Sequence, residues 1–142
     1  MSVPVPSCER LMKHNMFNSL MSRFQLLINS LGVIVDGQLT FKAHVNAVAK
    51  ACNYHIWSFR HIRHLLTQGI AHTLARSIVM SKLDYCNAIL HGSPKSSIAV
   101  LQRTQNSLAR VVLQQSKYTS ATPLLKSLHW LPVQHRIQLK LL

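Results

Sequence analysis

The side chains that could carry chemistry in this 142-residue chain are mostly cations. Sixteen Lys and Arg face three acids, Glu9, Asp36 and Asp84, which leaves a formal net charge of +13. Nucleotidyl transfer by two metal ions requires several clustered carboxylates, and acid–base catalysis by a carboxyl pair requires two that act together. No two of the three acids are adjacent in sequence. We therefore predict that the chain is not an enzyme.

Histidine and cysteine are the other candidate groups, with nine His and three Cys. Cys52, His55, His61 and His64 have a spacing that resembles a zinc motif. On one helix, however, Cys52 and His64 would lie about 18 Å apart along the axis and could not bind the same ion. We expect no metal site and no cofactor, with Cys52 packed in the core and the histidines on a basic surface. The odd number of cysteines fits a reducing compartment, intracellular and either nuclear or cytoplasmic.

The cations predict a binding role. A surface with so few acids repels itself unless a polyanion is near, which makes RNA or DNA the expected partner. Arg103 and Arg110 are seven residues apart, share one helical face and are accompanied by Gln and Asn, although a solvated face of a bundle helix would have the same pattern. The cations expected to contact phosphates are Lys50, Arg60, Arg63, Arg76, Lys82, Arg103 and Arg110.

The elements that must position these residues are mainly helical. Ser7 could cap an uncertain helix within residues 1–29, and LGVIV (31–35) reads as one short strand closed by Asp36-Gly37. Helices are expected from Thr40 to about 64 and from Thr67 to about 82, after which the chain either continues as helix or bends near Asp84 and stops at Gly92. Further helices are expected from the Ser93-Pro94 cap to about 115 and from 132 onward, with a short turn at 123–128. No apolar run is long enough for a membrane span, so no membrane partner is expected.

Helical spacing also predicts the core. Trp57 and Trp130 are expected to be core or interface anchors, and an aromatic share of 6% argues against a platform for stacking bases. The apolar positions expected on inward faces are Val45, Val48, Cys52, Phe59 and Ile62, then Ile70, Leu74 and Ile78, then Ile98, Leu101, Leu108 and Val112.

Five segments resemble the end of LINE-type (non-LTR) retrotransposon reverse transcriptases. They are LGVIVDGQLTFKAHVNAVAKAC, FRHIRHLL, SKLDYCNAILHG, IAVLQRTQNSLARVV and PLLKSLHWLPVQHRI, in family order over residues ~30–142. The resemblance implies that residues 30–40 are the last palm strand and its turn. It implies that residues 41–142 are a thumb-like helical bundle and connection, which would grip a template–primer duplex.

The same resemblance implies that the catalytic aspartates are absent. In that family the aspartate-bearing palm motif precedes the LGV strand, and residues 1–29 contain no Asp. The lone strand and the uncapped last helix suggest a truncated chain from which palm and fingers are missing. We therefore expect a fragment with residual, non-specific affinity for an RNA–DNA hybrid. A non-functional transposon relic and a helical protein-interaction module remain open.

Overall fold

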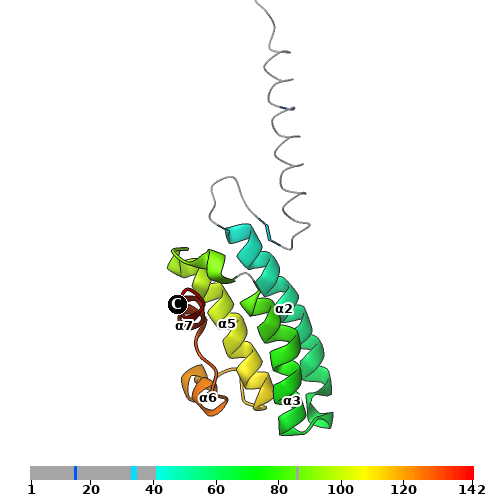
Figure 1. Cartoon of the computed structure of the whole chain (residues 1–142). Coiled ribbons are helices and arrows are strands. Elements are labelled where there is room, and N and C mark those ends of the chain that lie inside the picture. Colours follow the sequence, from blue (N-terminus) through cyan, green and yellow to red (C-terminus); the bar gives the residue numbers. More distant parts are fainter. Residues whose placement is uncertain (1–14, 16–32, 35–40, 86) are drawn as a thin grey trace, which may run out of the picture.

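The computed structural model describes residues 15, 33–34, 41–85 and 87–142. Nearly all of the described chain is helical, which confirms the predicted mainly α class (Figure 1). The elements are α2 (Lys42–Ile62), η1 (Arg63–Leu65), α3 (Gln68–Leu74), η2 (Ala75–Met80), α4 (Ser81–Asp84), η3 (Asn87–Leu90), α5 (Lys95–Val112), α6 (Ala121–Ser127) and α7 (Val133–Lys140).

The predicted strand at 31–35 falls mostly outside the described residues. Its two described members, Val33 and Ile34, are not in a strand. The helix expected within residues 1–29 and the cap at Thr40 also lie outside the described residues, apart from residue 15, which is helical.

The largest part of the described fold consists of α2, α5 and the continuous helical segment from α3 through η2 to α4. Figure 1 shows α2 and α5 side by side and running in the same direction, while α3 and its continuation through η2 and α4 return in the opposite direction. The shorter α6 and α7 pack against α5. Polar side chains of both α2 and α5 line the groove between these two helices.

Local signals in the sequence account for the start of α3 and for the end of the η3 segment. The Thr67 Oγ1 accepts a hydrogen bond from the Ile70 N–H at 3.4 Å, as the predicted N-cap should. Gly92 has φ +78°, a left-handed conformation that glycine adopts without strain, and it ends the η3 segment as expected. The predicted Ser93 cap is wrong: Pro94 occupies the cap position of α5, with no side-chain hydrogen bond.

The core confirms two of the three predicted apolar faces in large part. On α2, Val45, Cys52 and Phe59 are buried and Val48 is partly buried. On α5, Leu101, Leu108 and Val112 are buried, with Ile98 partly so. Ile62 is exposed, contrary to prediction, because α2 ends there and the next residue, Arg63, turns inward instead.

The predicted face of the second helix is wrong at two of its three positions, and only Leu74 packs against the core. Ile70 and Ile78 are exposed, whereas Ala71, Ala75, Val79 and Met80 face the core. The pattern-based choice favoured the larger side chains, but small alanines line the close approach to the neighbouring helices. The π-helical turns of η2 also add a residue per turn, so both members of the Val79-Met80 pair point inward.

None of the helices in the described part of the chain is both long and apolar enough to cross a membrane.

Candidate nucleic-acid interface

Polar and basic side chains line the groove where α2 and α5 lie side by side. It contains two shallow hollows of about 410 Å³ and about 260 Å³. We define the α2–α5 seam by seven of the polar residues that line them: Asn53, Arg60, His64, Arg103, Ser107, Arg110 and Lys117. The buried Arg63 also lines the larger hollow, together with Gln114 and Gln115, and Thr104 lines the smaller one.

Helical spacing places the seam residues in two facing rows. Asn53 and Arg60 are seven residues apart on α2, and Arg103 and Arg110 are seven apart on α5, so each pair nearly superposes on one face. Seven residues of helix rise about 10 Å, a length over which one strand of a duplex carries about three phosphates. The seam therefore has the dimensions of a short backbone-contacting track.

The seam arginines differ in how firmly they are held. Arg60 is exposed, and Arg103 is exposed with its Nε donating to Ala99 O of its own helix at 3.3 Å. Arg110 is half-buried, and its Nε donates to Thr119 O at 2.9 Å. That bond orients the Arg110 guanidinium in the larger hollow. The structure thus brings together three of the seven predicted phosphate contacts.

Arg63 requires a correction, because it is a structural residue rather than a surface cation. Only 6% of it is exposed. Its Nε donates to Val112 O at 2.8 Å, its Nη1 to Leu66 O at 2.9 Å and its Nη2 to Gln68 Oε1 at 2.6 Å. The guanidinium therefore binds a carbonyl at the C-terminal end of α5, where a cation complements the helix dipole. With these acceptors, Arg63 has little capacity left for phosphate.

The other three predicted cations lie apart from the seam. Lys50 is exposed on the solvent face of α2. Lys82 borders an apolar hollow beside His44 and Val48, and Arg76 lies in the larger groove described below. These three can raise the general positive potential, but none of them lines the two hollows of the groove between α2 and α5.

The electrostatic balance of the described chain is one-sided. Asp84 is its one side-chain carboxylate, and Arg136 binds it with two hydrogen bonds, one of them from Nε to Oδ1 at 2.8 Å. Asp84 is therefore a structural partner of Arg136 in the described fold. The seam cations consequently have no described carboxylate to neutralise them.

The glutamines of α5, expected on the polar face, instead anchor the chain between α6 and α7. Gln105 is buried, and its Nε2 donates to Leu131 O at 2.9 Å. Gln102 Oε1 accepts from the Val133 N–H at 2.8 Å, and its Nε2 donates to Asn106 Oδ1 at 2.9 Å. These side chains fix the LHWLPV segment to α5 and are not free for a ligand.

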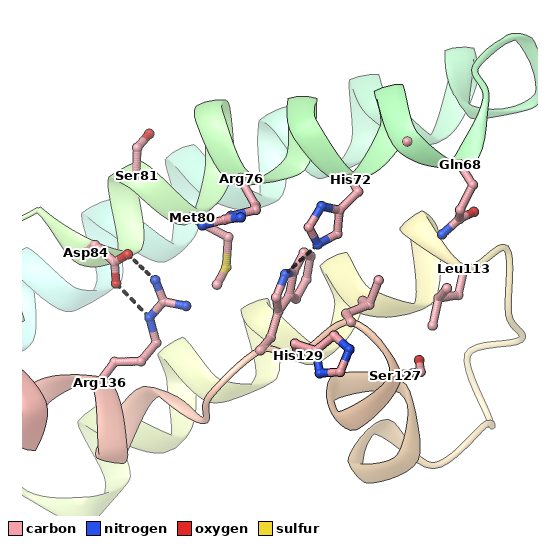
Figure 2. A pocket seen from close by; sticks show the side chains of 13 residues that line it. Gln68, His72, Arg76, Met80, Ser81, Asp84, Leu113, Ser127, His129 and Arg136 are labelled. Atoms are coloured by element: carbon pink, nitrogen blue, oxygen red, sulfur yellow. Dashed lines mark hydrogen bonds and ion pairs between the residues drawn. The ribbon is translucent and has the colours of Figure 1, made fainter.

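A wider groove lies between α3–η2–α4 and the segment around α6 and α7. Figure 2 shows His72 and Arg76 on one wall and His129 and Arg136 on the other, in a space of about 930 Å³. Trp130 is buried, as predicted, and its Nε1 donates to His72 Nε2 at 3.2 Å. Among the described residues, the hydrogen bonds that cross this groove join α3 and α4 to the segment after α6.

The groove also explains two motifs of the sequence. Asp84 in LDYCN binds Arg136 and accepts from Asn87 Nδ2 at 3.3 Å, while Lys140 Nζ donates to Asp84 O at 2.5 Å. The bonds of Arg136 and Lys140 to Asp84, together with the Trp130–His72 bond, join segments more than 50 residues apart. The motifs LDYCN and LHWLPV therefore hold the described fold together.

The thiol and imidazole groups offer no metal site in the part of the chain that is described, where no cluster of three or more His, Cys, Asp or Glu forms. Cys52 is fully buried, as predicted, and burial raises its pKa to about 11 against the opposing charge of Lys82. His44 is buried too, and desolvation lowers its pKa. A buried, protonated thiol is a poor nucleophile and a poor ligand.

Two features of the surface were not anticipated from the sequence. Lys117 joins the seam from the loop after α5, where its position depends on how that loop folds back. Trp57, expected in a core or interface, is 62% exposed. Its spacing from Lys50 and His61 on one helical face was the available signal.

Comparison of the chain with protein-family models, with curated protein sequences and with solved structures gave no match. The reverse-transcriptase resemblance therefore stays a prediction from the sequence motifs.

Proposed function

We propose that this protein binds nucleic acid through phosphate contacts along the α2–α5 seam, without catalysing a reaction. The observation that carries the proposal is the gathering of Arg60, Arg103, Arg110 and Lys117 on one surface with no described carboxylate near them. Such a surface favours a polyanion and reads no base sequence, since phosphate contacts are alike in every sequence.

The motifs quoted above support a more specific proposal, a thumb-like and connection-like region related to non-LTR reverse transcriptases. A parallel pair of helices with a basic seam is suited to gripping a template–primer duplex, here an RNA–DNA hybrid. The chain's three acids offer no set of metal-binding aspartates, so a polymerase active site would have to come from palm and fingers regions outside these residues.

The seam is tested by charge-matched double variants. Arg60→Ala/Arg103→Ala removes two exposed seam cations, and Arg76→Ala/Lys82→Ala removes two exposed cations elsewhere. Binding of a labelled hybrid duplex is followed by fluorescence anisotropy at several salt concentrations. The seam variant should lose about two units of slope in log K against log salt, since each phosphate contact contributes about 0.9. The control should lose much less; equal losses in both variants would refute a localised interface.

A second candidate, a helical protein-interaction module, is favoured by one apolar surface. A hollow of about 520 Å³ beside the first turns of α2 is lined largely by Ile34, Ala47, Val48, Ala51 and Tyr85. A partner helix or the rest of a larger protein could cover it. A specific protein partner together with no salt-sensitive affinity for nucleic acid would select this function.

A third possibility, a transposon relic without selected function, makes a different prediction. Aggregation of the purified chain without ligand, and unfolding without cooperativity, would favour it.

A further inference from the structure

Two aromatic rings stand on the solvent face of α2, away from the core. Tyr54 is 67% exposed and Trp57 is 62% exposed, whereas the chain's other tryptophan, Trp130, is 6% exposed. Large aromatic side chains normally bury their rings, because each removes a large apolar area from water. The buried line of α2 runs through Val45, Ala49, Cys52, Ile56 and Phe59 on the other side of the helix.

These rings belong to a regular stripe in which they lie between cationic and imidazole groups. Lys50, Tyr54, Trp57 and His61 follow one another at spacings of four, three and four residues, which places them on one helical face. Arg60 lies at the border of this stripe and also belongs to the α2–α5 seam. We call Lys50, Tyr54, Trp57 and His61 the α2 stripe.

Within the described part of the chain, the indole of Trp57 has one ring neighbour, the imidazole of His61. Its ring lies 4.3 Å from the His61 ring, centroid to centroid, at an interplanar angle of 56°. The His61 Nδ1 lies 2.9 Å from Trp57 O, which fixes the imidazole against the helix. Since most of the indole remains exposed, the residues of its own helix leave room for a further planar group to stack on it.

The charges around the α2 stripe indicate which kind of ligand carries the planar group. Lys50 and Arg60 are exposed, and no acid occurs anywhere in α2. An apolar protein surface would bury the rings but would leave these cations without partners. A single-stranded nucleic acid supplies both kinds of group, bases for the rings and phosphates for the cations.

We infer that the α2 stripe binds unpaired nucleotides, with bases stacked on Trp57 and Tyr54 and phosphates on Lys50 and Arg60. This inference rests on the proposed function. It adds that the α2 stripe, which lies beside the α2–α5 seam, binds single-stranded nucleic acid. In a duplex the internal base faces are covered by their neighbours, so the rings can contribute only where bases are unpaired.

The test compares Trp57→Ala and Trp57→Phe with the unsubstituted protein. A labelled 12-nucleotide oligo(dT) and a blunt duplex of 12 base pairs are titrated at the same salt concentration. Stacking on an aromatic ring contributes about 1–3 kcal/mol per base, which corresponds to roughly 5- to 150-fold in affinity. Trp57→Ala should weaken oligo(dT) binding by about that factor and change duplex binding less than twofold, while Trp57→Phe retains most of the affinity.

Matched controls separate stacking from general surface effects. Ile70→Ala removes another exposed apolar side chain, on α3, and should leave both affinities unchanged. Circular dichroism and thermal unfolding verify that each variant is folded, as expected for exposed positions.

Three outcomes decide the inference. Equal weakening of both ligands by Trp57→Ala, or no weakening of either, overturns it while the duplex-binding function stands. Absence of any nucleic-acid binding by the unsubstituted protein overturns the proposed function and this inference together. Selective loss of single-strand affinity supports the inference, and retention by Trp57→Phe identifies the aromatic ring as the cause.

Discussion

Replacement of Arg63 by alanine should destabilise the fold strongly, although the residue lies in a run of cations that looks like a binding surface. The guanidinium is buried and donates three hydrogen bonds, to Val112 O, Leu66 O and Gln68 Oε1. The bond to Val112 O connects the end of α2 to the end of α5, 49 residues later in the chain, and the other two hold the turn between α2 and α3. Arg63→Ala removes all three and leaves two backbone carbonyls without their donor.

The magnitude follows from two opposing contributions. A hydrogen bond with a charged partner contributes roughly 1.5–3 kcal/mol, and three such bonds in one group add incompletely. Removing the buried cation also relieves its desolvation cost, which is several kcal/mol for an isolated buried charge. We expect a net loss of about 3 kcal/mol in the free energy of unfolding, which is a large part of the roughly 5–15 kcal/mol typical of a domain.

Urea unfolding followed by circular dichroism measures this loss directly. Arg60→Ala is the control, because Arg60 is exposed on the same helix and its removal should change the free energy of unfolding by about 0.5 kcal/mol or less. Arg63→Ala should lower the midpoint without changing the m-value, and should lower the melting temperature by roughly 10–25 °C. Equal free energies of unfolding for the two variants would refute the structural role of Arg63, which would then be a candidate phosphate contact again.

Two further predictions concern buried titratable groups. In a variant with Cys8 and Cys86 replaced by Ser, the Cys52 thiol should react with Ellman's reagent at pH 8 at least about 100-fold more slowly in the folded than in the urea-unfolded protein. The reason is that the raised pKa keeps the thiol protonated and burial shields it from the reagent. Equal rates in the two states would contradict this prediction. Its contribution to stability should be full below the ordinary pKa of 9.0 and be lost as the pH rises through about 11. The lowered pKa of His44 has the opposite consequence: its stabilising contribution is full above pH 6.5 and is lost as the pH falls below that value. Between pH 7.5 and 5 the free energy of unfolding of the protein should therefore fall more than that of the His44→Asn variant. The Asn amide oxygen can accept the Ile34 N–H in place of the His44 Nδ1. Parallel curves of stability against pH would show that His44 is not the cause.

Two helix boundaries could be predicted from the sequence because local signals determine them. Thr67 and Gly92 act through their own backbone and nearest turns, so their types were enough to place the helix start and the stop. The face of α5 followed from its spacing alone, since Leu101, Leu108 and Val112 are large enough to dominate the packing.

What the sequence did not yield depends on contacts between distant segments. Arg63 resembled its neighbour Arg60 in type and setting, and only the position of α5 determines which of them turns inward. Gln102 and Gln105 looked like surface polar groups, because their partners lie 26–31 residues later, in the connection to α7. In physical terms, burial of a polar side chain depends on a distant acceptor or donor, and no local pattern encodes it.

The candidate site shows the same division. Residues of one helix, such as Arg103 and Arg110, could be placed together by counting residues. Their alignment with Arg60 required the parallel packing of α2 and α5, and the contribution of Lys117 required the path of a loop.

The most direct test of a phosphate-gripping seam is the salt dependence of binding to an RNA–DNA hybrid duplex, with light scattering recorded on the same samples. Four seam cations, Arg60, Arg103, Arg110 and Lys117, predict a monodisperse protein whose log K falls linearly with log salt at a slope of about −3 to −4. Affinity that does not change with salt, or heavy scattering before nucleic acid is added, would contradict it.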